Sequence, residues 1–196
     1  MVKKESKNNE ILLPNRKAFL KDVENGFFNK LVIFDVSSFG NINHYYGYDF
    51  GEKILKIISF RLQERFENSQ MYYLGGDIFV ATASENISKE RFIQTIKATT
   101  WHFGYSPIEL DGHKVYIPLR AGVAINYPEL LFCAEFALKQ TRVLKHNLVI
   151  FDSEQHQVCH PNSLSIEQDL YWEAQIIQAI KKDKFEIFAQ SISNQN

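Results

Sequence analysis

Hydrophobic and polar residues follow one another along the chain in blocks that are typical of helices and strands around a single core. Residues 31–36, Leu-Val-Ile-Phe-Asp-Val, are β-branched and aromatic up to the aspartate, which predicts a strand buried on both faces. Residues 71–74 and 78–83 have the same character, and the Gly-Gly-Asp between them predicts a tight hairpin. Two more strands are predicted at 115–125 and 148–151.

Apolar residues at helical spacing predict four helices, one before the first strand and three between the strands. The first ends at Gly26, a typical C-cap. The second begins at a capping box formed by Asp49 and Glu52. The others are predicted at 88–100 and 128–144. A hairpin inserted among alternating helices and strands favours an α+β fold with a mixed, mostly antiparallel central sheet flanked by helices, and argues against a doubly wound parallel sheet.

Composition limits the classes of partner and compartment. The 196 residues are 45% hydrophobic and 23% charged with a net charge of −1, so we expect one core and neither nucleic acid nor direct membrane contact. Residues 1–10 are polar, unlike a signal peptide, and we expect them to be disordered. Cys133 and Cys159 are too few for a disulfide framework, and we expect reduced thiols. We therefore expect a cytoplasmic location, while a membrane anchor upstream in a longer parent protein stays open.

Two carboxylates stand out as candidate chemistry. Asp35 ends a predicted strand and Asp77 follows the two glycines of the hairpin. If the hairpin lies beside that strand, the two acids meet at one end of the sheet and can hold Mg²⁺, as polymerase-like sites do. Spacing alone favours the alternative that both are turn residues, which is a common position for aspartate.

Several spaced motifs resemble GGDEF domains over residues 11–152. They are Leu-Pro-Asn-Arg at 13–16, Phe-Asp-Val-Ser-Ser-Phe-Gly-Asn-Ile-Asn at 34–43, Gly47 and Gly51, Leu-Gly-Gly-Asp-Ile-Phe at 74–79, Leu-Arg-Ala-Gly-Val-Ala at 119–124, and the stretch from Ala134 to Asn147. The resemblance implies the palm-like fold shared with class III cyclases. It also implies the condensation of two GTP molecules to cyclic di-GMP in a homodimer, in which each 3′-hydroxyl attacks the α-phosphate of the other GTP.

The resemblance also assigns roles to individual residues. The implied metal ligands are Asp35, the carbonyl of Val36, and Asp77. The implied nucleotide contacts are Asn43 and Glu52 at guanine and Arg142 at phosphate. Mg²⁺, with Mn²⁺ as the alternative ion, is expected only if GTP binds.

The signature itself departs from the family pattern. It reads Gly75, Gly76, Asp77, Ile78, Phe79. Ile78 replaces the glutamate, and further family residues are replaced by Ser37, Gly40, His44 and Tyr73. Loss of one positioned acid or base costs about 10²–10⁴ in rate, so we expect a degenerate site without confident catalytic residues. Phe66 and Ser69 replace the arginine and aspartate of the family's product-inhibition site, and we expect no feedback binding of cyclic di-GMP there.

The C-terminal part resembles the start of a second domain. Residues 153–164 are polar and predict a linker. Residues 170–180 and 184–192 are similar to the entry helix and first strand of EAL cyclic di-GMP phosphodiesterases, so 165–196 is predicted to be a truncated EAL start. The alternative is a helix and strand that complete the first domain.

Three functions follow from these features. The first is a regulatory domain that binds GTP or dimerises and controls a downstream EAL phosphodiesterase. The second is a weakly active diguanylate cyclase. The third is an interaction scaffold without a ligand.

Overall fold

The computed structural model describes residues 11–154. Within this range the helices are α1 Arg16–Asn25, α2 Phe39–Tyr46, α3 Tyr48–Arg65, α4 Lys89–Tyr105 and α5 Leu130–Leu144, and the strands are β1 Lys30–Val36, β2 Gln70–Gly75, β3 Ile78–Ala83, β4 Ile108–Leu110, β5 His113–Val115, β6 Leu119–Ile125 and β7 Leu148–Asp152. The predicted lead-in, the linker from residue 155 onward and the predicted EAL start lie outside the described residues.

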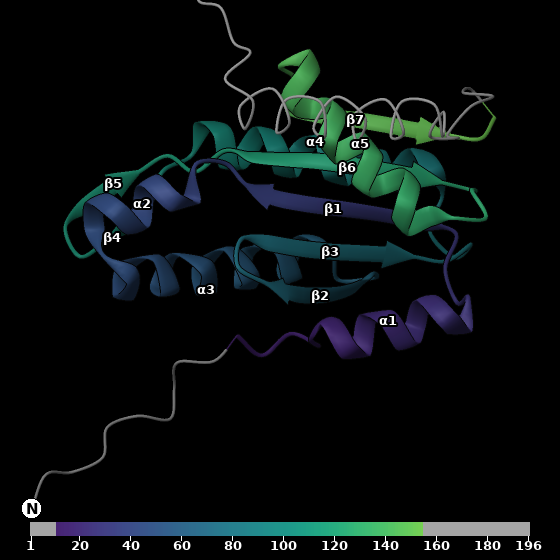
Figure 1. Cartoon of the computed structure of the whole chain (residues 1–196), viewed down its shortest axis with the longest axis horizontal. Helices are drawn as coiled ribbons and strands as arrows, with labels where there is room; N and C mark the ends of the chain where they lie inside the picture. The colour runs from purple at the N-terminus through teal and green to yellow at the C-terminus, as the bar shows by residue number, and fades with distance from the viewer. Residues whose placement is uncertain (1–10, 155–196) are drawn as a thin grey trace, which may run out of the picture. The chain divides into compact units, whose positions relative to one another are not determined.

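The five long strands form one sheet in the order β2-β3-β1-β6-β7 (Figure 1). β1 is central and pairs antiparallel with both β3 and β6, whereas β6 and β7 are parallel. The sheet is therefore mixed and mostly antiparallel, and the predicted α+β class is confirmed. β4 and β5 form a separate two-stranded sheet.

The side chains of β1 alternate between two cores, one on each face of the sheet. Helices cover both faces because each core needs a layer of helices against it. Val32 and Phe34 pack in the larger core with residues of α3 and α4. Leu31 and Ile33 pack in a second core with residues of α1 and α5. Since neighbouring residues of a strand face opposite sides, Asp35 lies on the α1 and α5 side.

Gly122 sets how closely α5 lies on β6. A methyl group at this position would overlap the backbone carbonyl of Ala134 and the backbone nitrogen of Leu138. The missing side chain lets the helix backbone contact the strand directly. α5 follows β6 and runs back across it, so its last turn, with Arg142, returns to the end of the sheet where β1 ends and β6 begins.

The prediction around the second helix was wrong in two respects. The short helix α2 was not predicted, and α3 begins at Tyr48 behind Gly47, not at an Asp49–Glu52 capping box. Gly47 has φ 89° and ψ 161°, a conformation favoured by glycine, so the chain turns there and two helices meet. α2 has no side-chain cap, and burial of Phe39 and Ile42 stabilises it instead.

The predicted strand at 115–125 is also wrong in extent. Residues 113–115 belong to β5, which pairs with β4 across a turn at Asp111 and Gly112, while β6 begins only at Leu119. Both turn residues have positive φ, as a two-residue hairpin turn requires. Pro118 precedes β6 and cannot donate a backbone hydrogen bond, which separates the two strands.

Two remaining expectations concern the cysteines and membrane-spanning helices. Cys133, buried on α5, is disulfide-bonded, so the expectation of a reduced thiol there was wrong. Too few cysteines for a framework does not exclude a single disulfide bond. Cys159 lies outside the described residues. Among residues 11–154 no helix has the length and apolar character needed to cross a membrane.

Candidate functional site

Asp35, the first predicted metal ligand, is buried at the end of β1 with 2% of its side chain exposed. Arg120 of β6 lies directly opposite it in the strand register. The Nε and Nη2 atoms of Arg120 are 2.8 and 2.6 Å from the Asp35 Oδ2 atom. Nη2 of Arg142, at the end of α5, approaches the same oxygen at 3.5 Å. One buried carboxylate thus contacts two guanidinium groups.

Ile78 lies on the other side of Asp35. The register pairs Asp35 with Ile78 on β3 and with Arg120 on β6, so the three side chains form one row across the sheet. Ile78 packs against the α1 and α5 core. The signature position that the family fills with a glutamate therefore places an apolar side chain beside Asp35, and the only charged member of the row next to Asp35 is cationic.

Asp77, the second predicted metal ligand, lies close to Asp35 as expected. Gly75 and Gly76 have φ of 101° and 62°, which forms the tight turn before it. The Asp77 carbonyl accepts a hydrogen bond from the Val36 backbone N–H at 3.0 Å, which ties the hairpin to the end of β1. Burial and the nearby Asp35 carboxylate raise the pKa of the Asp77 carboxyl. The two acids repel each other across this end of the sheet.

Asn43, predicted to contact guanine, lies on α2 and points at α3. Its Oδ1 atom is buried and has no hydrogen-bond partner within the described part of the chain. A methyl group at Gly51 would overlap this oxygen, so the glycine provides the space for the Asn43 amide. An unsatisfied buried amide oxygen costs about 1–3 kcal/mol, which leaves Asn43 with an unmet need for a donor.

Glu52, the other predicted guanine contact, is exposed on the first turns of α3. Tyr73 of β2 lies within reach of its charge: burial, Glu52 and Asp77 together raise the pKa of the Tyr73 hydroxyl. The hydroxyl donates a hydrogen bond to the Gly76 carbonyl at 3.0 Å, and the ring packs on Phe79 at 5.0 Å between centroids. Tyr73 therefore lies near both the acid of α3 and the acid of the hairpin.

The acidic ligands at this end of the sheet are fewer than a divalent metal normally takes. Mg²⁺ requires about six oxygen ligands in octahedral geometry. The Asp35 Oδ2 atom already contacts three guanidinium nitrogen atoms. Among residues 11–154 no group of three or more histidine, cysteine or acidic side chains is placed to hold a metal ion. The metal roles of Asp35, Val36 and Asp77 and the phosphate role of Arg142 stay predictions.

Sequence reasoning did not identify Arg120 as a functional residue. It appeared only inside the motif at 119–124, with no role of its own. The sequence feature that could have identified it is the alternation of side chains along β6. Leu119, Ala121 and Val123 belong to one core, and Arg120 faces the other side of the sheet. An arginine inside a buried strand needs an acidic partner, and the nearest acid across the sheet is Asp35.

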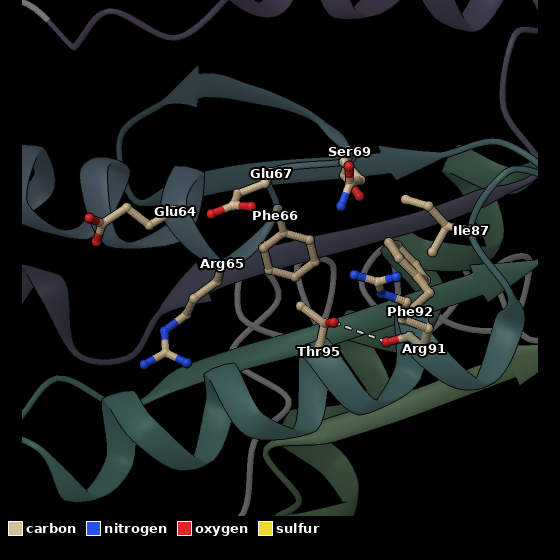
Figure 2. A pocket seen from close by; sticks show the side chains of 10 residues that line it. Glu64, Arg65, Phe66, Glu67, Ser69, Ile87, Arg91, Phe92 and Thr95 are labelled. Atoms are coloured by element: carbon tan, nitrogen blue, oxygen red, sulfur yellow. Dashed lines mark hydrogen bonds between the residues drawn. The ribbon is translucent and has the colours of Figure 1, made fainter.

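A separate pocket lies on the α3 and α4 side of the sheet. It has a volume of about 270 Å³ and is lined by Phe66 and Ser69, the two positions predicted to have lost the product-inhibition site. Figure 2 shows the side chains of Arg65 and Arg91 to either side of the Phe66 ring in this view. The ring of Phe66 packs against the ring of Phe92, with 6.2 Å between the ring centroids. The expected loss of feedback binding stays a prediction.

Comparisons with known proteins place the chain in a family. Residues 12–142 match the family model described as diguanylate cyclase, GGDEF domain. A cyclic di-GMP phosphodiesterase, NbdA of Pseudomonas aeruginosa, is 29% identical over 176 residues, which cover 83% of this chain and 21% of that protein. The chain thus spans about a fifth of the length of this curated relative.

Solved structures share the fold. The GGDEF domain of YfiN (TpbB) from Pseudomonas aeruginosa is 26% identical, with a TM-score of 0.61 over 72% of this chain and 98% of that chain. A diguanylate cyclase/phosphodiesterase from Caldicellulosiruptor saccharolyticus is 18% identical, with a TM-score of 0.64 over 73% of this chain and 91% of that chain. The second likeness concerns the fold alone.

Proposed function

The chain belongs to the GGDEF domain family, and from that membership we propose that residues 11–152 form a regulatory domain of cyclic di-GMP signalling with a degenerate cyclase site. The proposal rests on the row Ile78, Asp35, Arg120. A cyclase must balance the charge of a triphosphate with metal held by carboxylates. Here Ile78 stands where the signature has a carboxylate, and the guanidinium of Arg120 contacts Asp35.

The expected loss of catalytic rate favours a regulatory role over synthesis of cyclic di-GMP. Loss of one positioned acid or base costs about 10²–10⁴ in rate, and loss of one charge-stabilising group costs about 10²–10³. These costs need not add. Either loss alone would lower the rate of synthesis at least about a hundredfold.

GTP is the ligand we propose for the regulatory role. The unsatisfied Asn43 oxygen and the exposed Glu52 carboxylate are the kinds of group that read a guanine edge. Arg142, 63% exposed, is available to a phosphate. We further propose that the domain acts in the cytoplasm, as a homodimer, on an EAL phosphodiesterase domain that follows it; the name of the relative NbdA motivates that partner.

The test is a calorimetric titration of the chain with GTP, with ATP as the control nucleotide. We expect micromolar binding of GTP, weaker binding of ATP, and loss of the preference in Asn43→Ala. Arg91→Ala, an arginine change on α4 away from these residues, serves as a matched surface control. Absence of binding by either nucleotide would refute the ligand-sensing role and leave dimerisation or scaffolding.

A weak diguanylate cyclase is the second candidate, because Asp35 and Asp77 do lie together at one end of the sheet. It predicts slow formation of cyclic di-GMP from GTP that disappears in Asp77→Ala. Chromatography of overnight reactions distinguishes the two candidates. No product above the level of Asp77→Ala would exclude synthesis at this site.

A further inference from the structure

We propose that Arg120 is a built-in cation that takes the place of a divalent metal on Asp35, so that this site binds no Mg²⁺ or Mn²⁺. The inference goes beyond the proposed regulatory function and holds whether or not GTP binds. It rests on contacts of described residues: the Arg120 nitrogens at 2.6 and 2.8 Å from a carboxylate oxygen that is 2% exposed.

The register fixes this contact, because Arg120 and Asp35 are direct cross-strand neighbours on one face of the sheet. Arg120 is itself only 24% exposed. Two long, flexible surface side chains would lose most of their attraction to screening by solvent, whereas a buried carboxylate and a largely buried guanidinium on adjacent strands keep it. The guanidinium is therefore a permanent part of the site.

Charge explains why a metal cannot share this position. Arginine stays protonated throughout the physiological pH range, so Arg120 contributes a full positive charge that no chelator removes. A divalent ion at Asp35 would lie a few ångströms from Arg120 and near Arg142. At such distances a divalent ion and a guanidinium repel each other strongly in a partly buried setting, and Ile78 offers no second carboxylate to offset that repulsion.

The chemical consequence is a site whose positive charge is independent of metal concentration. Any phosphate-bearing ligand at this end of the sheet would meet guanidinium donors, which bind phosphate oxygens directly. Binding would then be insensitive to EDTA, unlike binding through a bridging Mg²⁺.

The experiment measures Mn²⁺ binding to the whole chain by electron paramagnetic resonance of the free ion, without nucleotide. We expect no Asp35-dependent site in the wild type, so that Asp35→Asn changes nothing. Arg120→Ala should expose Asp35 and bind Mn²⁺ at least about tenfold more tightly, and Asp35→Asn in that background should abolish the gain. Arg91→Ala is the matched control and should resemble the wild type.

Two outcomes overturn the proposal. One is Mn²⁺ binding by the wild type that Asp35→Asn removes. The other is a folded Arg120→Ala protein, verified by circular dichroism, that gains no Mn²⁺ affinity. If Arg120→Ala does not fold, Arg120→Gln, which keeps a donor and most of the volume, replaces it. The wild-type measurement decides the first outcome without any variant.

Discussion

Two buried aspartates lie beside β6, one toward each of its ends. Asp35 of β1 is paired with Arg120 near the start of β6, and Asp152, the last residue of β7, is paired in register with Ile125 at its end. Each carboxylate contacts a basic group at short distance: Arg120 Nη2 at 2.6 Å for Asp35, and Lys89 Nζ at 2.8 Å for Asp152. Only Asp35 belongs to the predicted site.

The difference between them lies in their other neighbours. Asp152 accepts a further hydrogen bond from the Glu154 backbone N–H, and Lys89 also contacts the Glu154 carboxylate, so this cluster joins the start of α4 to the end of β7. Asp35 has the like-charged Asp77 nearby and apolar Ile78 in its row. The comparison teaches that Asp35 has a basic partner at short distance, as the structural Asp152 does, and differs from Asp152 in the apolar Ile78 beside it.

The largest effect is expected from Arg120→Ala. It leaves a buried carboxylate without its partner, which costs about 3–5 kcal/mol of unfolding free energy, measured by urea denaturation at neutral pH without divalent ions. The double change Asp35→Asn with Arg120→Gln should recover most of the loss, because no unpaired charge is left. Arg142→Ala, at an exposed group 3.5 Å away, should cost less than about 1 kcal/mol. Equal losses for the two arginines would contradict the central role of Arg120.

The second effect concerns Ile78. Ile78→Glu places a carboxylate directly across from Asp35. In the Arg120→Ala background it should raise Mn²⁺ affinity by about tenfold over Arg120→Ala alone, measured by the same resonance titration. With Arg120 present, the new acid should have much less effect. Ile78→Gln in the same background is the uncharged control, and a gain as large as that of glutamate would show that charge is not the cause.

Lys89→Met removes the corresponding partner of Asp152 and should lower thermal stability less than Arg120→Ala, since Asp152 keeps its backbone donor. Hydrogen bonds to Asp152 and Glu154 raise the pKa of Lys89 above its ordinary 10.5. A raised lysine pKa means a contribution that is complete below pH 10.5 and lost only as pH rises beyond it. The stability difference from wild type should therefore be equal at pH 6 and pH 9. If the stability difference between Lys89→Met and the wild type shrinks from pH 6 to pH 9, the raised pKa of Lys89 is contradicted. Lys97→Met, on the exposed side of α4, is the control.

Much of the fold could be predicted because its strands are long and strongly patterned. β1, the hairpin and α1 with its Gly26 cap follow from local sequence. α2 could not be found in this way, because glycine and two asparagines in eight residues give it low helix propensity and tertiary packing holds it. The β4–β5 hairpin had a local signal, the Asp111-Gly112 pair, which indicates a two-residue turn.

The site was only half predictable for a different reason. The sequence predicted that Asp35 and Asp77 lie close together, because one ends a strand and the other belongs to a hairpin expected beside that strand. The contact of Asp35 with Arg120 depends on which strand lies on the other side of β1 and in which register, and the two residues are 85 positions apart. A slip of one residue would turn Arg120 to the opposite face. Local sequence holds no information on that register.

The smallest effect, from Asp77→Asn, tests whether the two acids of the site repel or share a cation. Burial and the Asp35 charge raise the pKa of Asp77 above its ordinary 3.8. The folded state thus holds the Asp77 proton more tightly than the unfolded state, so ionised Asp77 costs stability at neutral pH and this cost disappears below about pH 3.8. Asp77→Asn should therefore raise the unfolding free energy at pH 7 by roughly 0.5 kcal/mol, allowing for screening by solvent. Asp111→Asn, at an exposed turn where the acid pairs with Lys53, should give no such gain. A loss of stability in Asp77→Asn would mean that a cation bridges Asp77 and Asp35, and the site would then resemble a metal centre more than the structural pair at Asp152.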